Sequence, residues 1–237
     1  MLAHHGMVRI CAHIPAAASE LTGLRVLLIA DVLARVAELQ GAQAFIAWTF
    51  AEQYGGVETI VERAADALNV HPPTARTNAP VPSASEADVY VTAGADAIEG
   101  SSAVSLVVAG VHDGGSVPGL ADMLAGPDPL AIRFALLSCP LREPAKLTEG
   151  TLASARETLG QWRSQVARWA ESASRPIPEQ VMAAYRTAFG DADIATVLTM
   201  LVTLAADDMV APGAKFESFL YADRVLGLDL PSGIGRM

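Results

Sequence analysis

The feature that most constrains this chain is a short apolar strand that runs directly into a long helix close to the N-terminus. Residues 9–14 form the expected strand, residues 15–19 a turn, and residues 21–39 a helix that is apolar almost all round. A helix with apolar residues on every side must be packed on two sides. Because a strand that feeds a helix N-terminus is a common nucleotide site in α/β proteins, the segment predicts an α/β domain organised around one buried helix.

Strands and helices continue to alternate over the first half of the chain. The expected strands are residues 43–50, 88–91 and 104–108, and the expected helices are residues 57–68 and 120–124. Residues 69–87 are interpreted as a loop and residues 110–119 as a glycine-rich turn. This alternation predicts a mostly parallel, Rossmann-like sheet in a first domain, residues 1–127.

From Pro129 onwards the pattern is helical. Helices are expected, with no strand between them, at residues 130–137, 147–171, 179–189, 194–206 and 215–226. Asp193 stands where it can cap the helix that follows it. The fold class is therefore predicted to be α/β, with a reduced Rossmann-like parallel-sheet domain followed by an α-helical bundle, residues 128–237.

The charge of the chain is unevenly divided. Residues 1–132 carry five Lys or Arg side chains against fourteen Asp or Glu, whereas residues 133–237 carry eleven against twelve. A surface that grips phosphates needs basic groups or exposed backbone amides, so the first half argues against nucleic-acid binding. The two cysteines give no disulfide framework. No apolar run is long enough to span a membrane and the N-terminus has no signal-peptide pattern, so we expect a cytoplasmic protein that does not bind membranes.

A series of short motifs occurs in a fixed order along the chain. They are Cys11, Arg25, and residues 30–33 (Ala-Asp-Val-Leu), 66–73 (Asp-Ala-Leu-Asn-Val-His-Pro-Pro), 88–91 (Asp-Val-Tyr-Val), 94–98 (Gly-Ala-Asp-Ala-Ile), 128–137 (Asp-Pro-Leu-Ala-Ile-Arg-Phe-Ala-Leu-Leu), 141–142 (Leu-Arg), 191–196 (Asp-Ala-Asp-Ile-Ala-Thr) and 225–228 (Val-Leu-Gly-Leu). In this order they resemble the cysteine branch of the class I aminoacyl-tRNA synthetases. That branch includes the ligase that couples cysteine to a sugar amine in mycothiol synthesis. The resemblance covers most of residues 7–229 and implies an ATP-dependent aminoacyl ligase as ancestor.

The departures from that family bear on function. At the HIGH motif, whose histidines help to stabilise ATP phosphates in the family, this chain has Glu20-Leu21-Thr22-Gly23, and a glutamate at a helix start repels phosphate. The KMSKS position falls on residues 109–113, which contain no lysine to neutralise developing charge. Of the family's zinc ligands only Cys11 has a match, and we find no counterpart of the insertion that binds the tRNA acceptor end. These departures imply that amino-acid activation is lost, that neither ATP nor a metal is a cofactor, and that transfer RNA is not expected as a partner.

A small-molecule pocket, if one persists, is predicted where the strands end. The substrate-binding residues that the resemblance implies there are Cys11, His13, Glu20, Thr22, Gly23, Gly94 and Asp96, and no catalytic residue is predicted. Asp96 falls at the position that meets the ATP ribose in the family. An aspartate accepts hydrogen bonds from a diol, so a nucleoside or an amine suits this acidic pocket better than ATP. The alternative is a collapsed pocket filled by side chains.

Two uncharged patterns allow both a functional and a structural interpretation. Cys11 and His13 alternate on a strand and so share a face, which gives either the start of a metal site or a buried thiol beside a hydrogen-bonded histidine. We favour the buried thiol, because a structural metal usually needs four ligands. The glycines within residues 110–119 form either a phosphate cradle or a surface loop, and we favour the loop.

The charged patterns are interpreted as structural. Arg156, Arg163 and Arg168 lie on one expected helix, where a solvated face interleaved with glutamates is favoured over a nucleic-acid patch. Asp31 and Arg35 are spaced four apart on the long helix and are expected to form an ion pair that supports the fold.

Two function hypotheses follow. In the first, the chain is a degenerate paralogue of the cysteine synthetase and cysteine ligase branch that has lost amino-acid activation and acts as a binding or regulatory protein, with a small-molecule ligand or a protein as its partner. In the second, it remains an ATP-dependent ligase or aminoacyl-transferring enzyme that joins an amino acid such as cysteine to a small amine through a rebuilt site. The scarcity of basic residues near the expected strand ends favours the first hypothesis.

Overall fold

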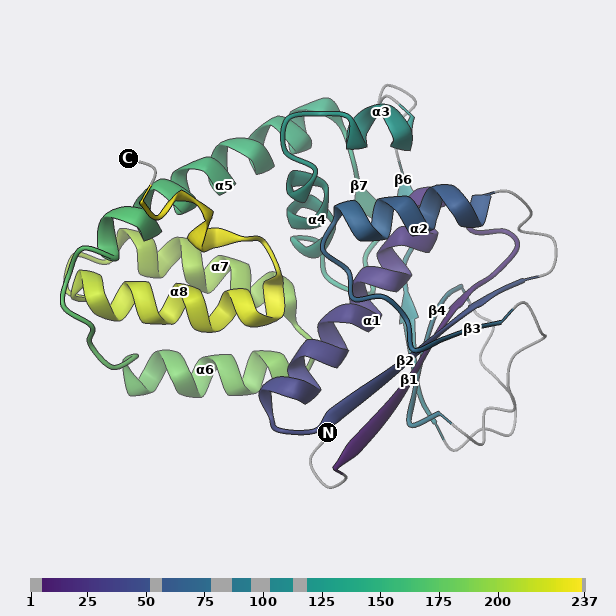
Figure 1. The fold of residues 1–237 in the computed structure, drawn as a ribbon, viewed down its shortest axis with the longest axis horizontal. Helices are drawn as coiled ribbons and strands as arrows, with labels where there is room; N and C mark the ends of the chain where they lie inside the picture. Colours follow the sequence, from purple (N-terminus) through teal and green to yellow (C-terminus); the bar gives the residue numbers. More distant parts are fainter. Residues whose placement is uncertain (1–5, 52–56, 78–86, 95–102, 113–118, 236–237) are drawn as a thin grey trace.

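The structure of the protein is a computed structural model. It describes residues 6–51, 57–77, 87–94, 103–112 and 119–235. Their strands are β1 (Met7–Ile14), β2 (Gln43–Phe50), β3 (Ala75–Thr77), β4 (Val89–Ala93), β5 (Val104–Val108), β6 (Val111–His112) and β7 (Ala145–Lys146). Their helices are α1 (Glu20–Leu39), α2 (Val57–Ala67), α3 (Leu120–Leu124), α4 (Leu130–Leu137), α5 (Glu149–Trp169), α6 (Glu179–Gly190), α7 (Ile194–Ala206), α8 (Pro212–Leu226) and the 3-10 helix η2 (Leu230–Gly233) (Figure 1).

The main sheet is parallel and has the strand order β3-β2-β1-β4-β5 (Figure 1). The register places Ile10 of β1 beside Ile46 of β2 and Val89 of β4, all three of which are buried. The strand order reverses direction between β1 and β4, and in doubly wound sheets ligands bind outside the carboxyl ends of the strands at such a point. The predicted α/β class with a Rossmann-like parallel sheet is confirmed.

Helix α1 is the centre of the molecule. Every residue from Leu21 to Ala34 is buried, because the helix packs on β1, β2 and β4 on one side and on α2, α4 and α8 on others (Figure 1). Ser19 caps its N-terminus, since the Ser19 hydroxyl accepts a hydrogen bond from the Thr22 backbone N–H. The apolar pattern over residues 21–39 therefore correctly predicted a helix enclosed on several sides.

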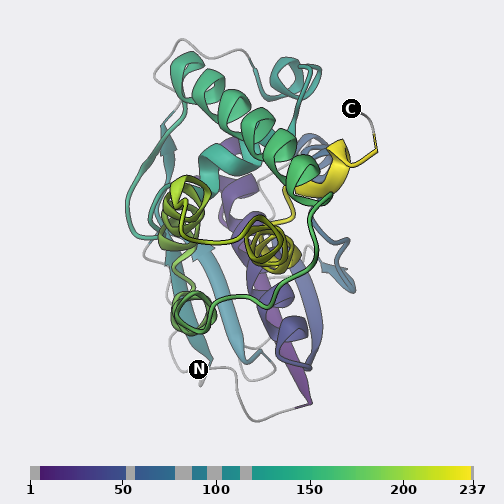
Figure 2. The same ribbon diagram turned by 90° about the vertical axis from the view of Figure 1, so that its left-hand side faces the viewer.

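The second half of the chain is mainly helical. Helices α6, α7 and α8 are seen nearly end-on in Figure 2 and lie roughly aligned, while α5 crosses them at an angle. Phe219 of α8 is fully buried and contacts Trp162 and Trp169 of α5 edge-on, with ring centroids 5.4 and 5.1 Å apart. Asp193 caps α7 as predicted, because its carboxylate accepts the Thr196 N–H.

Three short strands were not predicted from the sequence. β3 lies within the predicted loop 69–87 and β6 within the predicted glycine-rich turn. β7 lies between α4 and α5, so the expectation of no strand after Pro129 is wrong. β6 and β7 pair with each other, which joins residues on either side of the expected boundary at 127. Strands of two or three residues are too short to give a periodic pattern, and only their distant partners define them.

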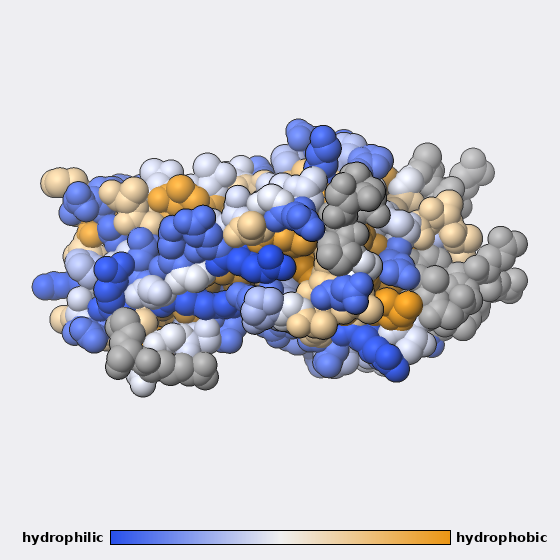
Figure 3. Space-filling view, turned by 90° about the horizontal axis from the view of Figure 1, so that it is seen from above, coloured by the Kyte–Doolittle hydropathy of each residue, from blue (hydrophilic) through white to orange (hydrophobic). Residues whose placement is uncertain are grey.

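The surface seen from above in Figure 3 is mostly hydrophilic, with apolar residues in small separate areas. Within the part of the chain that the structure describes, no helix combines the length and the apolar character that a membrane crossing requires.

Candidate functional site

Cys11 and His13 of β1 lie on the same face of the sheet and meet the same neighbour. The Thr49 hydroxyl of β2 lies 2.9 Å from His13 Nδ1 and 3.9 Å from Cys11 Sγ. The His13 ring stacks on Tyr90 of β4, with centroids 5.9 Å apart and an interplanar angle of 20°. Burial raises the pKa of the Cys11 thiol, and the hydrogen bond with Thr49 only partly offsets this. The favoured interpretation, a buried thiol beside a hydrogen-bonded histidine, is confirmed.

The N-terminus of α1 is occupied by the protein's own groups. The Ser19 hydroxyl donates to Thr22 Oγ1 at 2.9 Å while accepting the Thr22 N–H at 3.2 Å. Thr22 Oγ1 also accepts the backbone N–H of Val111 in β6 at 2.9 Å. Glu20 is in the first turn, where its charge complements the helix dipole, and Gly23 is buried directly after Thr22. The Thr22 N–H is thus already bound within the chain, and the Glu20 charge disfavours a phosphate at this end of the helix.

The segment at the KMSKS position is anchored beside that N-terminus. The Ala109 N–H donates to Leu141 O at 3.0 Å, and β6, which follows, pairs with β7. Arg25 of α1 is fully buried beneath this segment, and no carboxylate among the described residues pairs with it. Its guanidinium donates at 2.8–3.0 Å to the carbonyl oxygens of Ala109, Glu143, Cys139 and Pro140. Burial lowers the pKa of Arg25.

The predicted binding residues thus fall into separate groups. Cys11 and His13 share contacts with Thr49, whereas Thr22 and Gly23 belong to the α1 N-terminus. Gly94 follows β4 directly and has φ +86°, a left-handed conformation that favours glycine. Asp96 lies outside the described residues, so the proximity of Glu20 and Asp96 stays a prediction. Among the described residues, no group of three or more His, Cys, Asp or Glu side chains is arranged to hold a metal ion.

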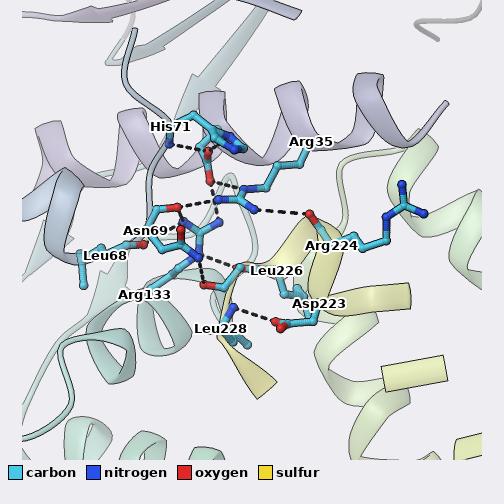
Figure 4. A network of polar contacts seen from close by, with 11 residues as sticks. Arg35, Leu68, Asn69, His71, Arg133, Asp223, Arg224, Leu226 and Leu228 are labelled. Carbon is cyan, nitrogen blue, oxygen red and sulfur yellow. Dashed lines mark hydrogen bonds and ion pairs between the residues drawn. The ribbon is translucent and has the colours of Figure 1, made fainter. Parts of the chain in front are cut away.

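A second polar centre lies at the other end of α1, where the sheet domain meets the later helices (Figure 4). Asp31 is fully buried, and its Oδ2 accepts hydrogen bonds from Arg133 Nη2 at 2.7 Å and from Arg35 Nε at 2.9 Å. Its Oδ1 accepts the His71 backbone N–H at 3.0 Å. Burial alone would raise the pKa of Asp31, but the contact with His71 and the charges of Arg133 and Arg35 hold this pKa well below its usual value. The predicted pair of Asp31 and Arg35 is confirmed, as part of a larger network.

Arg133 of α4 extends this network to the end of α8. Its guanidinium is fully buried and donates to the carbonyl oxygens of Leu226, Leu68 and Asn69 as well as to Asp31. Gly227 ends α8 with φ +61°, and a Cβ there would lie 3.0 Å from Arg133 Nη2 and 3.2 Å from Arg35 Cζ. Glycine is therefore required at this position both by its conformation and by the close approach of two guanidinium groups.

Asp223 completes the junction from the side of α8. Its two carboxylate oxygens accept the backbone N–H groups of Leu228 at 2.7 Å and Leu230 at 2.9 Å. The contact with Leu228 is drawn in Figure 4. Burial raises the pKa of Asp223, because these two hydrogen bonds only partly compensate for the loss of water. A cavity of about 440 Å³ opens beside the network and is lined by Arg35, Asp66, Ala67, Asn69, Leu130, Asp223, Gly227 and Asp229.

The role of Arg133 was not predicted, although the sequence contains a signal for it. Arg133 is the only charged residue in the otherwise apolar helix α4, and a lone charge in such a helix indicates a buried partner. The expectation of a solvated arginine face on α5 is wrong for Arg163. This side chain forms an ion pair with Asp128 and donates to Leu228 O at 2.8 Å.

The fold and these contacts define a protein of the Rossmann-like α/β class, with the reversal of strand order between β1 and β4. No family model matches the chain. Over 103 residues the chain is 39% identical to L-cysteine:1D-myo-inositol 2-amino-2-deoxy-alpha-D-glucopyranoside ligase of Kytococcus sedentarius. The similar region is 44% of this chain and 21% of the ligase, so the chain spans about a fifth of the length of the curated relative it matches. This local similarity supports the relationship to cysteine ligases that the motifs predict.

Proposed function

We propose that this chain derives from the cysteine ligase branch of the class I aminoacyl-tRNA synthetases, has lost amino-acid activation, and acts as a binding or regulatory protein. The observation that carries the proposal is the occupied N-terminus of α1. Glu20 supplies a negative charge there, Ser19 caps the helix, and Thr22 accepts the Val111 N–H. An ATP phosphate at this position would meet a carboxylate instead of the family's histidines, and the Thr22 N–H is already bound by Ser19.

The anchored segment of residues 109–112 supports the same proposal. In the family this position supplies lysine to the phosphates, and neither a lysine nor an arginine lies between Arg76 and Arg133 in this chain. β6 is paired with β7, and the Ala109 carbonyl is bound by Arg25. A reaction that develops negative charge on phosphate therefore lacks its stabilising cation here.

The ligand of this proposal is a small neutral or cationic molecule, such as a nucleoside or an amine, bound at the carboxyl ends of β1 and β4. Cys11, His13, Glu20, Thr22, Gly23, Gly94 and Asp96 are its proposed binding residues. The first half of the chain is acidic, which suits a cation and disfavours a nucleotide triphosphate. The proposal includes neither a metal nor transfer RNA.

Cysteine-dependent exchange of pyrophosphate into ATP tests the loss of activation. The Kytococcus sedentarius ligase serves as the positive control and a reaction without protein as the blank. We expect this chain to match the blank. A clear cysteine-dependent signal would overturn the proposal and favour the second hypothesis, an ATP-dependent ligase that joins an amino acid to a small amine.

Thermal shift measurements with adenosine, ATP, cysteine and glucosamine test the binding role. A ligand at a hundred times its dissociation constant adds about 2.7 kcal/mol of stability. We expect a shift with adenosine or glucosamine that exceeds the shift with ATP, and we expect Asp96→Ala to abolish it. Glu157→Ala removes an exposed carboxylate on α5 and is the matched control. An equal response of both variants, or a shift with ATP alone, would contradict the proposed pocket.

A further inference from the structure

The two edges of the main sheet differ in how they are protected. The β3 edge is three residues long and follows Pro72 and Pro73, and Arg76 within it pairs with Glu62 at 3.0 Å. Short strands, prolines and charged side chains are the usual means by which proteins prevent pairing at a sheet edge. The β5 edge lacks both prolines and charged side chains, because residues 103–109 contain neither.

The backbone of β5 presents unpaired hydrogen-bonding groups on its outer side. In a parallel ladder a residue directs both its N–H and its C=O to the same neighbouring strand, and the next residue directs both to the other side. The Val104 N–H donates to Asp88 O, so Val104, Leu106 and Val108 direct their backbone N–H and C=O groups toward β4. Ser105 and Val107 therefore direct their N–H and C=O groups outward, where no described residue pairs with them.

The side chains of β5 are exposed on both faces of the sheet. Val104 is 39% exposed and Val107 is 40% exposed, and their odd spacing places them on opposite faces. The open part of the edge is bounded, since the chain bends at Ala103 and the Ala109 N–H is already bound by Leu141 O. The occupant of this edge is consequently an uncharged strand of about five residues that is apolar on both faces.

We propose that β5 pairs in an antiparallel direction with β5 of a second copy of this chain, about a two-fold axis at Leu106. β5 is itself an uncharged strand of the required length, with apolar residues on both faces. In this register Ser105 faces the partner's Val107, and each such pair exchanges two N–H···O bonds through the groups that now point outward. The bends at Ala103 and the contacts of Leu141 stop the pairing at both ends and set this register.

Charge favours contact at this edge over contact elsewhere. Each chain carries a net charge of −10, which opposes association of two copies through most of their surfaces. The β5 edge contains no charged residue, so it does not add to this repulsion. A contact through five residues is smaller than the roughly 1,200–2,000 Å² of a stable interface, so the dimer forms in a concentration-dependent equilibrium.

Disulfide cross-linking in a Cys139→Ser background tests the register. In the proposed dimer Leu106 faces the partner's Leu106 in a pair without hydrogen bonds, with Cα atoms about 4.5 Å apart, which suits a disulfide. Leu106→Cys is therefore expected to form a covalent dimer under mild oxidation. Val104→Cys is the matched control, because the two copies of this position lie roughly 13 Å apart and cannot be bridged. Equal cross-linking of both variants, or of neither, would overturn the proposal.

Sedimentation velocity over about a hundredfold range of concentration tests the edge itself. We expect the wild-type chain to shift from monomer to dimer over this range. Val107→Lys places a charge on the β5 edge and is expected to weaken the dimer at least about tenfold. Ala75→Lys makes the same kind of change on the β3 edge and is expected to leave the dimer intact. A wild-type chain that stays monomeric, or an equal effect of both lysines, would contradict β5 pairing, and matching melting temperatures show that each variant is folded.

Discussion

Two fully buried arginines, Arg25 and Arg133, join α1 to later parts of the chain in different ways. Arg25 donates to four backbone carbonyl oxygens and, within the part of the chain that the structure describes, pairs with no carboxylate. Arg133 donates to three carbonyl oxygens and to Asp31, which is fully buried as well. The first arginine is held by dipoles alone, and its buried Nε has no hydrogen-bond partner in the described part of the chain. The second belongs to an ion pair that has left water completely.

Arg25 anchors one short segment of the chain, whereas Arg133 belongs to a network that joins several elements. Arg25 holds the segment around residues 139–143, whose residues are exposed or half-buried, so water can replace the guanidinium there. Asp31 also binds Arg35 and the His71 backbone, and Arg133 reaches the end of α8. Removal of one member of a buried ion pair leaves an uncompensated charge in the core, which is costly. We therefore expect the Asp31 junction to contribute more to stability than the Arg25 anchor.

The largest effect is expected for Asp31→Asn. This change leaves the buried Arg133 guanidinium without its anionic partner and is expected to reduce the free energy of unfolding by about 3–5 kcal/mol. Urea unfolding followed by circular dichroism measures the loss. Asp66→Asn, an exposed carboxylate on α2, is the control and is expected to change stability by less than ~0.5 kcal/mol. Similar values for the two variants would show that the buried pair does not stabilise the junction.

A smaller loss is expected for Arg25→Met. Methionine fills much of the apolar volume of the side chain but leaves four carbonyl oxygens without their donor. Because water can reach the exposed segment, we expect a loss of about 1–3 kcal/mol, the cost of one buried unsatisfied group. The same urea titration measures it. A loss larger than that of Asp31→Asn would reverse the ranking of the two arginines.

The elements that the sequence predicted are those with a long local pattern. The apolar run of α1, the apolar strands β1 and β2, and the cap at Asp193 all depend on neighbours that are close in the chain. β3, β6 and β7 could not be predicted, because pairing with residues far away in the chain defines them. Their existence follows from the fold, and the sequence pattern alone contains no trace of it.

The same distinction between local and distant contacts holds for the candidate site. The shared face of Cys11 and His13 follows from strand alternation, which is local. Their common partner Thr49 depends on the parallel register of β1 with β2, which no local pattern specifies. The partners of Arg25 and Arg133 lie 64 to 118 residues away in the chain, so the sequence could indicate only that each charge is buried in an apolar helix.

The two buried carboxylates of the junction are expected to respond to pH with opposite signs. The pKa of Asp31 is lowered, so its contribution to stability is fully present above the unfolded pKa of about 3.9 and is lost as the pH falls further. The pKa of Asp223 is raised by burial, so its charged form costs stability at neutral pH and this cost is relieved as the pH falls through the folded pKa.

Urea unfolding at several pH values from about 7 down to about 3 measures this contrast. The stability difference between wild type and Asp31→Asn is expected to stay constant between about pH 7 and pH 5 and to shrink below about pH 4. The difference between wild type and Asp223→Asn is expected to change in favour of wild type on acidification over the same range. Parallel curves for wild type and Asp223→Asn would show that burial does not penalise the Asp223 charge.

The smallest effect is expected for His71→Ala. The His71 Nδ1 atom lies 2.9 Å from Asp31 Oδ1, but no hydrogen bond is aligned between them, and the side chain is 44% exposed. The backbone N–H of residue 71 keeps its own hydrogen bond to Asp31 Oδ1 after the substitution. An exposed partner of this kind contributes less than about 1 kcal/mol, so we expect His71→Ala to shift the urea midpoint far less than Asp31→Asn. A loss comparable to that of Asp31→Asn would place the strength of the junction in the imidazole contact and not in the buried ion pair.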